Sequence, residues 1–214
     1  MIKEFGFLER TNGPLPYVVY VPRLDPMPKE LPTILFLHGR GESGADGLRQ
    51  TLIGLSHAIR NRRTDWPFLV IAPQKPEFDK LWPAHRDDLD KIIQLVEKEF
   101  PTDPHRRYIT GLSQGGNGTF ELADKLSWHF AAMAPVCGWS DRKDLHEAYQ
   151  SIPCWAFHGD ADQAVPIQKS IDAIKQIDSP LAKLTTYPGV GHNSWDNAYQ
   201  NEKLGEWFLS HTLE

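Results

Sequence analysis

The chain has 214 residues, of which 40% are hydrophobic and 24% charged, and its net charge is −5. This length and balance allow one well-buried core and exclude disordered, fibrous and low-complexity proteins. The charges form no block of one sign, so a nucleic-acid partner is not expected. We predict a single domain over residues 1–214.

The N-terminal sequence and the cysteines indicate the compartment. Residues 1–10 are interrupted by charge and cannot form the apolar core of a signal peptide, and no run reaches the roughly 18 apolar residues of a membrane span. We expect a cytoplasmic protein without a membrane partner, although a mature form that has lost its signal peptide would look the same. Cys137 and Cys154 lie in apolar runs without metal-type spacing, so buried free thiols are favoured over a disulfide, and no metal site is expected.

The predicted strands form one mostly parallel sheet. Residues 16–21, after the Asn12-Gly13 turn, predict an antiparallel hairpin at one edge of the sheet. From residue 31 onward, short β-rich apolar runs alternate with helical segments, which is typical of a parallel sheet with helices on both faces. These runs are 32–37, 68–72, 107–110, 130–136, 154–157 and 183–187.

Apolar residues at helical spacing predict helices between these strands. One helix begins behind Pro166, which suits a first helical turn, and the last begins near Asn197 and runs toward the C-terminus. We interpret the apolar residues of each helix as one face that packs on the core. They are Leu89, Ile92, Ile93, Val96 and Phe100; Ile167, Ile171, Ile174 and Ile177; and Leu204, Trp207 and Phe208.

A candidate nucleophile follows the third of these apolar runs. The segment Gly111-Leu112-Ser113-Gln114-Gly115 matches G-x-S-x-G and lies between a strand ending at Thr110 and a helix predicted over about 114–126. A serine hydroxyl is a weak nucleophile, so it must project from a sharp turn, and the flanking glycines leave room for that turn. The amides at the start of the helix then point toward the reacting oxygen.

A nucleophilic serine needs a base and an orienting carboxylate, which in this kind of site follow it in the order acid, then histidine. Asp160 and Asp162 lie in the loop after 154–157, and His192 lies in the loop after 183–187. Spacing alone does not decide between the two aspartates. His158 is expected to support the acidic loop through a hydrogen bond. Structural roles are expected for His57, His85, His105, His129, His146 and His211.

The loop after the first central strand supplies a third element, Leu37-His38-Gly39-Arg40-Gly41-Glu42-Ser43-Gly44. Its glycines let backbone N–H groups turn toward a developing oxyanion, so the predicted donors are Arg40 and Gln114. Residues 39–44 also match the dinucleotide fingerprint G-x-G-x-x-G. However, Pro73-Gln74-Lys75 stands where a ribose-binding acid should lie, so we favour a hydrolytic site without a cofactor.

With these motifs together, the chain resembles the α/β-hydrolase superfamily over nearly its whole length. Within it, the chain is similar to the small carboxylesterase/phospholipase-like and predicted-peptidase group, which is related to polyhydroxybutyrate depolymerase-like and feruloyl-type esterases. The resemblance is carried by segments 37–41, 107–116, 157–166 and 187–192. It implies the α/β-hydrolase fold, and it implies Asp162 as the acid because that position matches H-G-x-x-D-x-x-V-P.

The chain departs from that family at two places. Arg40 stands where a small or apolar residue is more usual, which leaves open a preference for acidic or phosphate-bearing substrates. The segment from Gly138 to Pro153 is too short for a lid domain, so an open, shallow pocket is expected. Trp82 and Trp139 are candidates to line that pocket, with ordinary packing as the alternative for each.

The expected activity is hydrolysis of a small-molecule carboxylic ester through Ser113, His192 and Asp162. Thioesters and amides pass through the same kind of intermediate and are the alternative substrates. A non-catalytic binding protein of the same fold is the alternative from another class. The sequence leaves the physiological ester and the oligomeric state open.

Overall fold

The structure is a computed structural model that describes residues 2, 4–61 and 66–214. Its strands are β1 (Gly6–Arg10), β2 (Tyr17–Val21), β3 (Leu31–Leu37), β4 (Leu69–Pro73), β5 (Thr102–Leu112), β6 (Ala132–Val136), β7 (Cys154–Gly159) and β8 (Ala182–Tyr187). Its helices are α1 (Gly54–Asn61), α2 (Arg86–Glu99), α3 (Gln114–Leu122), α4 (Leu145–Tyr149), α5 (Gln168–Ile177), α6 (Trp195–Gln200) and α7 (Leu204–Leu209), with short 3-10 turns η1 (Arg49–Thr51) and η2 (Trp82–His85).

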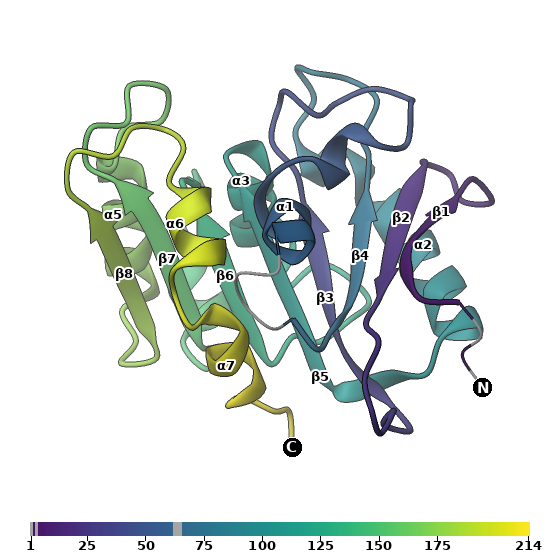
Figure 1. Ribbon diagram of the computed structural model, residues 1–214. Coiled ribbons are helices and arrows are strands. Elements are labelled where there is room, and N and C mark those ends of the chain that lie inside the picture. The colour runs from purple at the N-terminus through teal and green to yellow at the C-terminus, as the bar shows by residue number, and fades with distance from the viewer. Residues whose placement is uncertain (1, 3, 62–65) are drawn as a thin grey trace.

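The eight strands form one sheet in the order β1-β2-β4-β3-β5-β6-β7-β8 (Figure 1). β1 pairs antiparallel with β2, and β2 with β4, while the remaining neighbours are parallel. This confirms the predicted N-terminal hairpin at a sheet edge and the mostly parallel sheet. The order and the crossover helices define the α/β-hydrolase fold.

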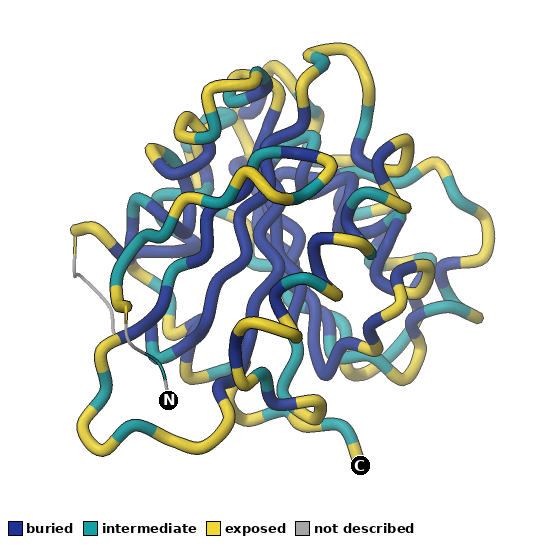
Figure 2. Tube along the Cα trace, turned by 90° about the vertical axis from the view of Figure 1, so that its right-hand side faces the viewer, coloured by how far each residue is buried: buried dark blue, intermediate teal, exposed yellow. Residues whose placement is uncertain are grey.

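Helices cover both faces of the sheet, and each face has its own apolar core. In Figure 1, α1, α6 and α7 lie in front of the sheet and α2, α3 and α5 lie behind it. Along β3, Leu35 and Leu37 pack with the rear helices, whereas Ile34 and Phe36 pack with the front ones. Strand residues are therefore buried on both sides, which explains the uninterrupted apolar runs (Figure 2).

Two features of the helices differ from the sequence analysis. The C-terminal segment is not one helix from near Asn197. The first helix, α6, ends at Gln200, residues 201–203 form a turn, and a second helix, α7, begins at Leu204. The N–H groups of Asn201 and Glu202 both return to the carbonyl of Asn197, which closes the first helix. The helix α1 was not predicted, although its buried Leu55, Ala58 and Ile59 have the spacing of a helical face.

The register aligns the carboxyl ends of five neighbouring strands. Leu37 of β3 pairs with Gly111 of β5, Leu112 with Val136 of β6, and Val136 with Phe157 of β7. Gly159 and Tyr187 pair at the ends of β7 and β8. The loops after these strands therefore lie side by side at one edge of the sheet, where α/β proteins bind ligands.

Both ends of the described chain lie at the opposite edge. Gly6, the first residue of β1, pairs with Val21 at the end of β2. Tyr17, at the other end of β2, pairs with Pro73 at the carboxyl end of β4, so Gly6 lies far from that end. Near the other end, the N–H of Leu213 bonds to the carbonyl of His105 in the first half of β5. None of the helices in the described ranges has the length and apolar character needed to cross a bilayer.

Candidate active site

Ser113 lies on a sharp turn between β5 and α3. Its φ is 55°, a left-handed value that is rare outside glycine. A Cβ atom added to Gly115 would lie 1.9 Å from the carbonyl oxygen of Leu37, and one added to Gly111 would lie 2.4 Å from that of Gly115. Glycine at both positions therefore allows α3 to start against β3 and β5, and the turn holds Ser113 at the carboxyl edge of the sheet.

Three side chains form a continuous hydrogen-bonded chain at this edge. His192 Nε2 lies 2.9 Å from Ser113 Oγ, and His192 Nδ1 lies 2.7 Å from Asp162 Oδ2. Because a carboxylate only accepts hydrogen bonds, Nδ1 donates to Asp162, and Nε2 is free to accept the proton of Ser113. Such an arrangement can take a proton from a serine as it attacks a carbonyl carbon.

Asp162 is held by its own loop. Its buried carboxylate accepts backbone hydrogen bonds at Oδ1 from Ala164, at 2.8 Å, and from Val165, at 2.9 Å. Burial raises the pKa of Asp162, but the hydrogen bonds from His192 and from these N–H groups outweigh burial and hold the pKa below its usual value. Asp160 is exposed and instead accepts the N–H of Gly189, at 2.7 Å. The structure thus places Asp162, and not Asp160, against His192.

His158 forms the hydrogen bond that was expected of it. Its Nε2 lies 3.1 Å from Asp162 Oδ2 and 2.9 Å from the Val165 carbonyl, and its Nδ1 lies 2.7 Å from Ser170 Oγ. The side chain has no exposed surface, and this burial lowers the pKa of His158. A neutral imidazole therefore links Asp162 to α5.

The predicted oxyanion donors come from adjacent segments. Gln114 is the first residue of α3, so its N–H has no partner within the helix. In the described ranges, no loop or turn hydrogen bond uses the N–H of Arg40. The Arg40 loop contacts the turn, because a Cβ on Gly39 would lie 2.9 Å from Leu112 Cδ1. Their role as oxyanion donors remains a prediction.

The side chains of these two residues meet the loop after β4. The exposed Arg40 Nη2 lies 2.8 Å from Asp79 Oδ1, and its guanidinium lies 6.0 Å from the centre of the Phe78 ring. Gln114 Nε2 donates to the carbonyl of Phe78 at 3.1 Å. The positive charge of Arg40 is therefore partly balanced by an aspartate at the surface.

Buried polar residues that the sequence analysis did not identify hold the loop after β3. Lys75 has no exposed surface, and its Nζ donates to Ser43 Oγ at 2.8 Å and to the Glu77 carbonyl at 2.6 Å. Burial lowers the pKa of Lys75 to about 8. Gln74 Nε2 donates to the Glu42 carbonyl at 2.9 Å.

His38 joins this network and is neutral. Its Nδ1 donates to the Gly39 carbonyl at 2.6 Å, and its Nε2 accepts the N–H of Lys75 at 3.1 Å. Burial lowers the pKa of His38 to about 3, so the ring carries no charge near neutral pH. The only sequence signal for this network is the position of these residues after neighbouring strands.

The two tryptophans proposed as pocket-lining residues differ in their surroundings. Trp82 has no exposed surface, and its Nε1 donates to the His38 carbonyl at 2.9 Å. A Cβ on Gly118 would lie 2.8 Å from Trp82 Cβ, so the indole occupies space that a glycine of α3 leaves free. For Trp82 the structure therefore agrees with ordinary packing, the alternative that the sequence left open. Trp139 is partly exposed, and its carbonyl accepts from Asn117 Nδ2 at 3.0 Å.

Two further expectations have a structural outcome. Cys137 and Cys154 are buried free thiols, as expected. Residues 39–44, which match the dinucleotide fingerprint, are followed by a loop and the short turn η1 before α1 begins at Gly54, whereas in a dinucleotide site the helix begins within the fingerprint.

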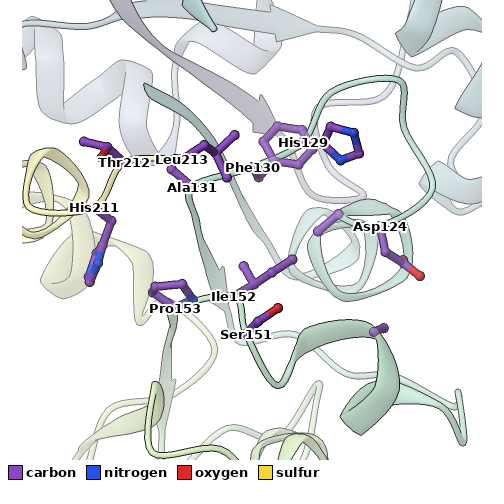
Figure 3. Close-up of a pocket in the computed structure, with 12 residues that line it drawn as sticks. Asp124, His129, Phe130, Ala131, Ser151, Ile152, Pro153, His211, Thr212 and Leu213 are labelled. Atoms are coloured by element: carbon purple, nitrogen blue, oxygen red, sulfur yellow. The ribbon is translucent and has the colours of Figure 1, made fainter. Parts of the chain in front are cut away.

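A separate hollow of about 470 Å³ opens at the other edge of the sheet (Figure 3). Its wall includes Ala131 and Pro153, which precede β6 and β7, and Asp124 and His211 lie on opposite sides of it. Because Ser113 follows the carboxyl end of β5, this hollow is not part of the hydrogen-bonded chain described above.

Comparison with known proteins agrees with the α/β-hydrolase class. Lysophospholipase-like protein 1 of Mus musculus is 25% identical in an alignment covering 92% of this chain and 94% of that protein. A thermostable esterase superposes with a TM-score of 0.84 at 29% identity, over 97% of this chain and 63% of the esterase, so this chain spans less than two thirds of that protein. Est1E from Butyrivibrio proteoclasticus shares the fold, with a TM-score of 0.70 at 18% identity over 96% and 98%.

The sheet order and the serine on the turn after β5 define an α/β-hydrolase. The model of the dienelactone hydrolase family matches residues 76–203, which is more than half of the chain. The chain belongs to the dienelactone hydrolase family, and it is a carboxylic ester hydrolase of the α/β-hydrolase kind.

Proposed function

We propose that the protein is a serine esterase that cleaves carboxylic esters through an acyl-enzyme on Ser113. The observation that carries this proposal is the hydrogen-bonded chain from Ser113 through His192 to Asp162, which has distances of 2.9 Å and 2.7 Å. The left-handed turn at Ser113 supports it, since strained backbone is concentrated at functional sites.

In the first half of the reaction, Ser113 Oγ attacks the ester carbonyl carbon while His192 Nε2 takes the hydroxyl proton. Asp162 accepts a hydrogen bond from Nδ1–H, fixes the tautomer and stabilises the imidazolium. The backbone N–H groups of Arg40 and Gln114 hold the oxyanion, and each such donor contributes about 3 kcal/mol in comparable sites. His192 then gives its proton to the leaving alkoxide.

In the second half, water replaces the alcohol. His192 takes a proton from the water as its oxygen attacks the acyl carbonyl, and returns that proton to Ser113 Oγ when the acid leaves. The bond formed in the first half is thereby broken, and the serine is regenerated.

The substrate class proposed is small or varied acyl esters. The segment from 137 to 153, between β6 and β7, contains the five-residue α4 and no further helix, so no lid domain covers the edge above Ser113. Among the structural neighbours, Est1E has been solved with ferulic acid, and a feruloyl esterase module with sinapinate. Esters of acids that differ in bulk are therefore the first substrates to compare.

The experiment is hydrolysis of p-nitrophenyl esters from acetate to long acyl chains by wild type, Ser113→Ala and His192→Ala. We expect short esters to be cleaved by wild type and the rate to fall by at least about a thousandfold in both variants. Labelling by a fluorophosphonate probe, abolished by Ser113→Ala, is the accompanying readout. A folded wild type that is inert toward all esters and unlabelled would overturn the proposal and favour a binding role.

A further inference from the structure

A buried thiol that the hydrolytic mechanism does not use lies against the triad. Cys137 is the first residue after β6, has no exposed surface, and has a left-handed φ of 39°. Its Sγ, a carboxylate oxygen of Asp162 and a ring nitrogen of His192 all lie within 4.8 Å of one another. Backbone strain of this kind persists only where the surrounding structure enforces it, and here it holds the sulfur toward the triad.

A fourth donor lies at the same place. Ser194 is buried, and its hydroxyl has no hydrogen-bond partner of good geometry in the part of the chain that the structure describes. It lies beside the Cys137 thiol. The sulfur therefore has an imidazole nitrogen and a carboxylate oxygen within 4.8 Å, and a buried hydroxyl beside it.

This donor set selects a particular class of ion. Sulfur and imidazole ligands suit Zn²⁺ and Cd²⁺, whereas Mg²⁺ and Ca²⁺ prefer oxygen ligands alone. We propose that Cys137, Asp162 and His192 form an inhibitory site for a thiophilic divalent cation. The inference of inhibition rests on the proposed function of the triad.

The inhibition follows from which ligand can move. The side chains of Cys137 and Asp162 are buried, whereas that of His192 is 27% exposed on the loop after β8. The imidazole therefore shifts onto the ion, and the hydrogen bond that joins Nε2 to Ser113 Oγ is lost. Without this base, Ser113 cannot lose its proton during attack.

The binding step is a ligand exchange without redox change. The S–H bond of Cys137 breaks, its proton passes to solvent, and the sulfur forms a bond to the ion. His192 stays neutral: the nitrogen that binds the ion gives up its proton, and the other ring nitrogen carries one instead. Burial raises the pKa of the Cys137 thiol to about 12, so the sulfur keeps its proton until a metal displaces it.

The first test is inhibition by ZnCl₂ in metal-free buffer, with wild type, Cys137→Ser and Cys154→Ser. Cys154 is the matched control because it is the second buried free thiol, and it lies at the start of β7, away from the carboxyl edge. We expect Zn²⁺ to inhibit wild type and Cys154→Ser equally, with recovery on adding EDTA. Inhibition of Cys137→Ser should need a Zn²⁺ concentration at least about tenfold higher. Equal sensitivity of Cys137→Ser and wild type would overturn the site.

The second test does not depend on ester hydrolysis. CdCl₂ should produce the ultraviolet thiolate-to-metal absorption band with one equivalent bound in wild type, Ser113→Ala and Cys154→Ser, but not in Cys137→Ser or Cys137→Ala. A band that requires Cys137 in a protein inert toward esters would support the site and reject the proposed function. Triad-dependent hydrolysis without such a band would reject the site and leave the proposed function standing.

Discussion

Asp162 is the residue on which two imidazoles converge, since its Oδ2 lies within hydrogen-bond distance of both His192 and His158. A carboxylate accepts only, so the nitrogen of each ring that faces it carries a proton. The remaining nitrogen of the neutral His158 then carries no proton and faces the Ser170 hydroxyl, whose one proton also has the Gly138 carbonyl within 2.9 Å. His158 is therefore fixed in one tautomer, as His192 is, and both orient the same acid.

At this scale we predict the effect of His158→Ala. Asp162 loses one donor, which is worth about 1.5 kcal/mol for a charged acceptor, so kcat should fall about tenfold with little change in KM. Losing a hydrogen-bond donor moves the pKa of Asp162 up toward its usual value, so the acid limb of the kcat/KM profile should move to higher pH. His158→Gln, which keeps an N–H donor, should restore part of the rate.

The control for this prediction is His129→Ala, because His129 is exposed and lines the hollow at the other edge of the sheet. Its pH–rate profile should match that of wild type. A His158→Ala variant that loses stability but keeps the wild-type profile would show that His158 only packs the loop.

Between elements, backbones approach each other closely where α3 starts. A Cβ atom on Gly115 would lie 1.9 Å from the carbonyl oxygen of Leu37 in β3. A Cβ atom on Gly116 would lie 2.4 Å from the carbonyl oxygen of Val136 in β6 and 2.8 Å from the Cα of Gly138. The start of α3 is thus wedged between the ends of β3 and β6. The position of Ser113 depends on this wedge, because it is the residue that precedes α3.

We therefore expect Gly115→Ala to lower the free energy of unfolding by about 3 kcal/mol or more, because a backbone oxygen cannot give way as a flexible side chain can. Gly41→Ala is the matched control, since a Cβ there meets nothing within 4 Å, and it should change stability by less than about 0.5 kcal/mol. Urea unfolding followed by tryptophan fluorescence measures both. Similar stability of the two variants would contradict the close approach.

Elements and site were predictable from the sequence to different degrees. The central strands were predicted from their uninterrupted apolar runs, and the helices α2 and α5 from apolar residues at helical spacing. The order serine, acid, histidine was predicted because Ser113, the loop with Asp160 and Asp162, and His192 each follow a strand, while the choice of Asp162 came from the family resemblance. The register brings those strand ends together. The contacts of Lys75 and Cys137 were not predictable, because they depend on which strands are neighbours. The sequence left the place of Trp82 open because the space that buries it is created by Gly118, a residue distant in sequence.

For the molecule as a whole, the sheet and its two helical layers leave the carboxyl edge without a covering domain within residues 4–61 and 66–214. Lid movement at a lipid surface is what produces a jump in rate when an ester passes its solubility limit. We expect the rate with p-nitrophenyl butyrate to rise smoothly through that limit and to show no jump on adding micelles. An abrupt increase would indicate that a loop at this edge closes over Ser113 in solution.

The chain runs from and returns to the edge of the sheet opposite the triad, with Gly6 at one end and the Leu213–His105 hydrogen bond at the other. A tether attached at either end therefore lies on the side of the molecule away from Ser113. Molecules attached to a bead or an electrode by one terminus would have Ser113 on the side that faces the solution, and a partner fused at a terminus would not cover it. The positions of the two termini thus set the orientation of the molecule on a support.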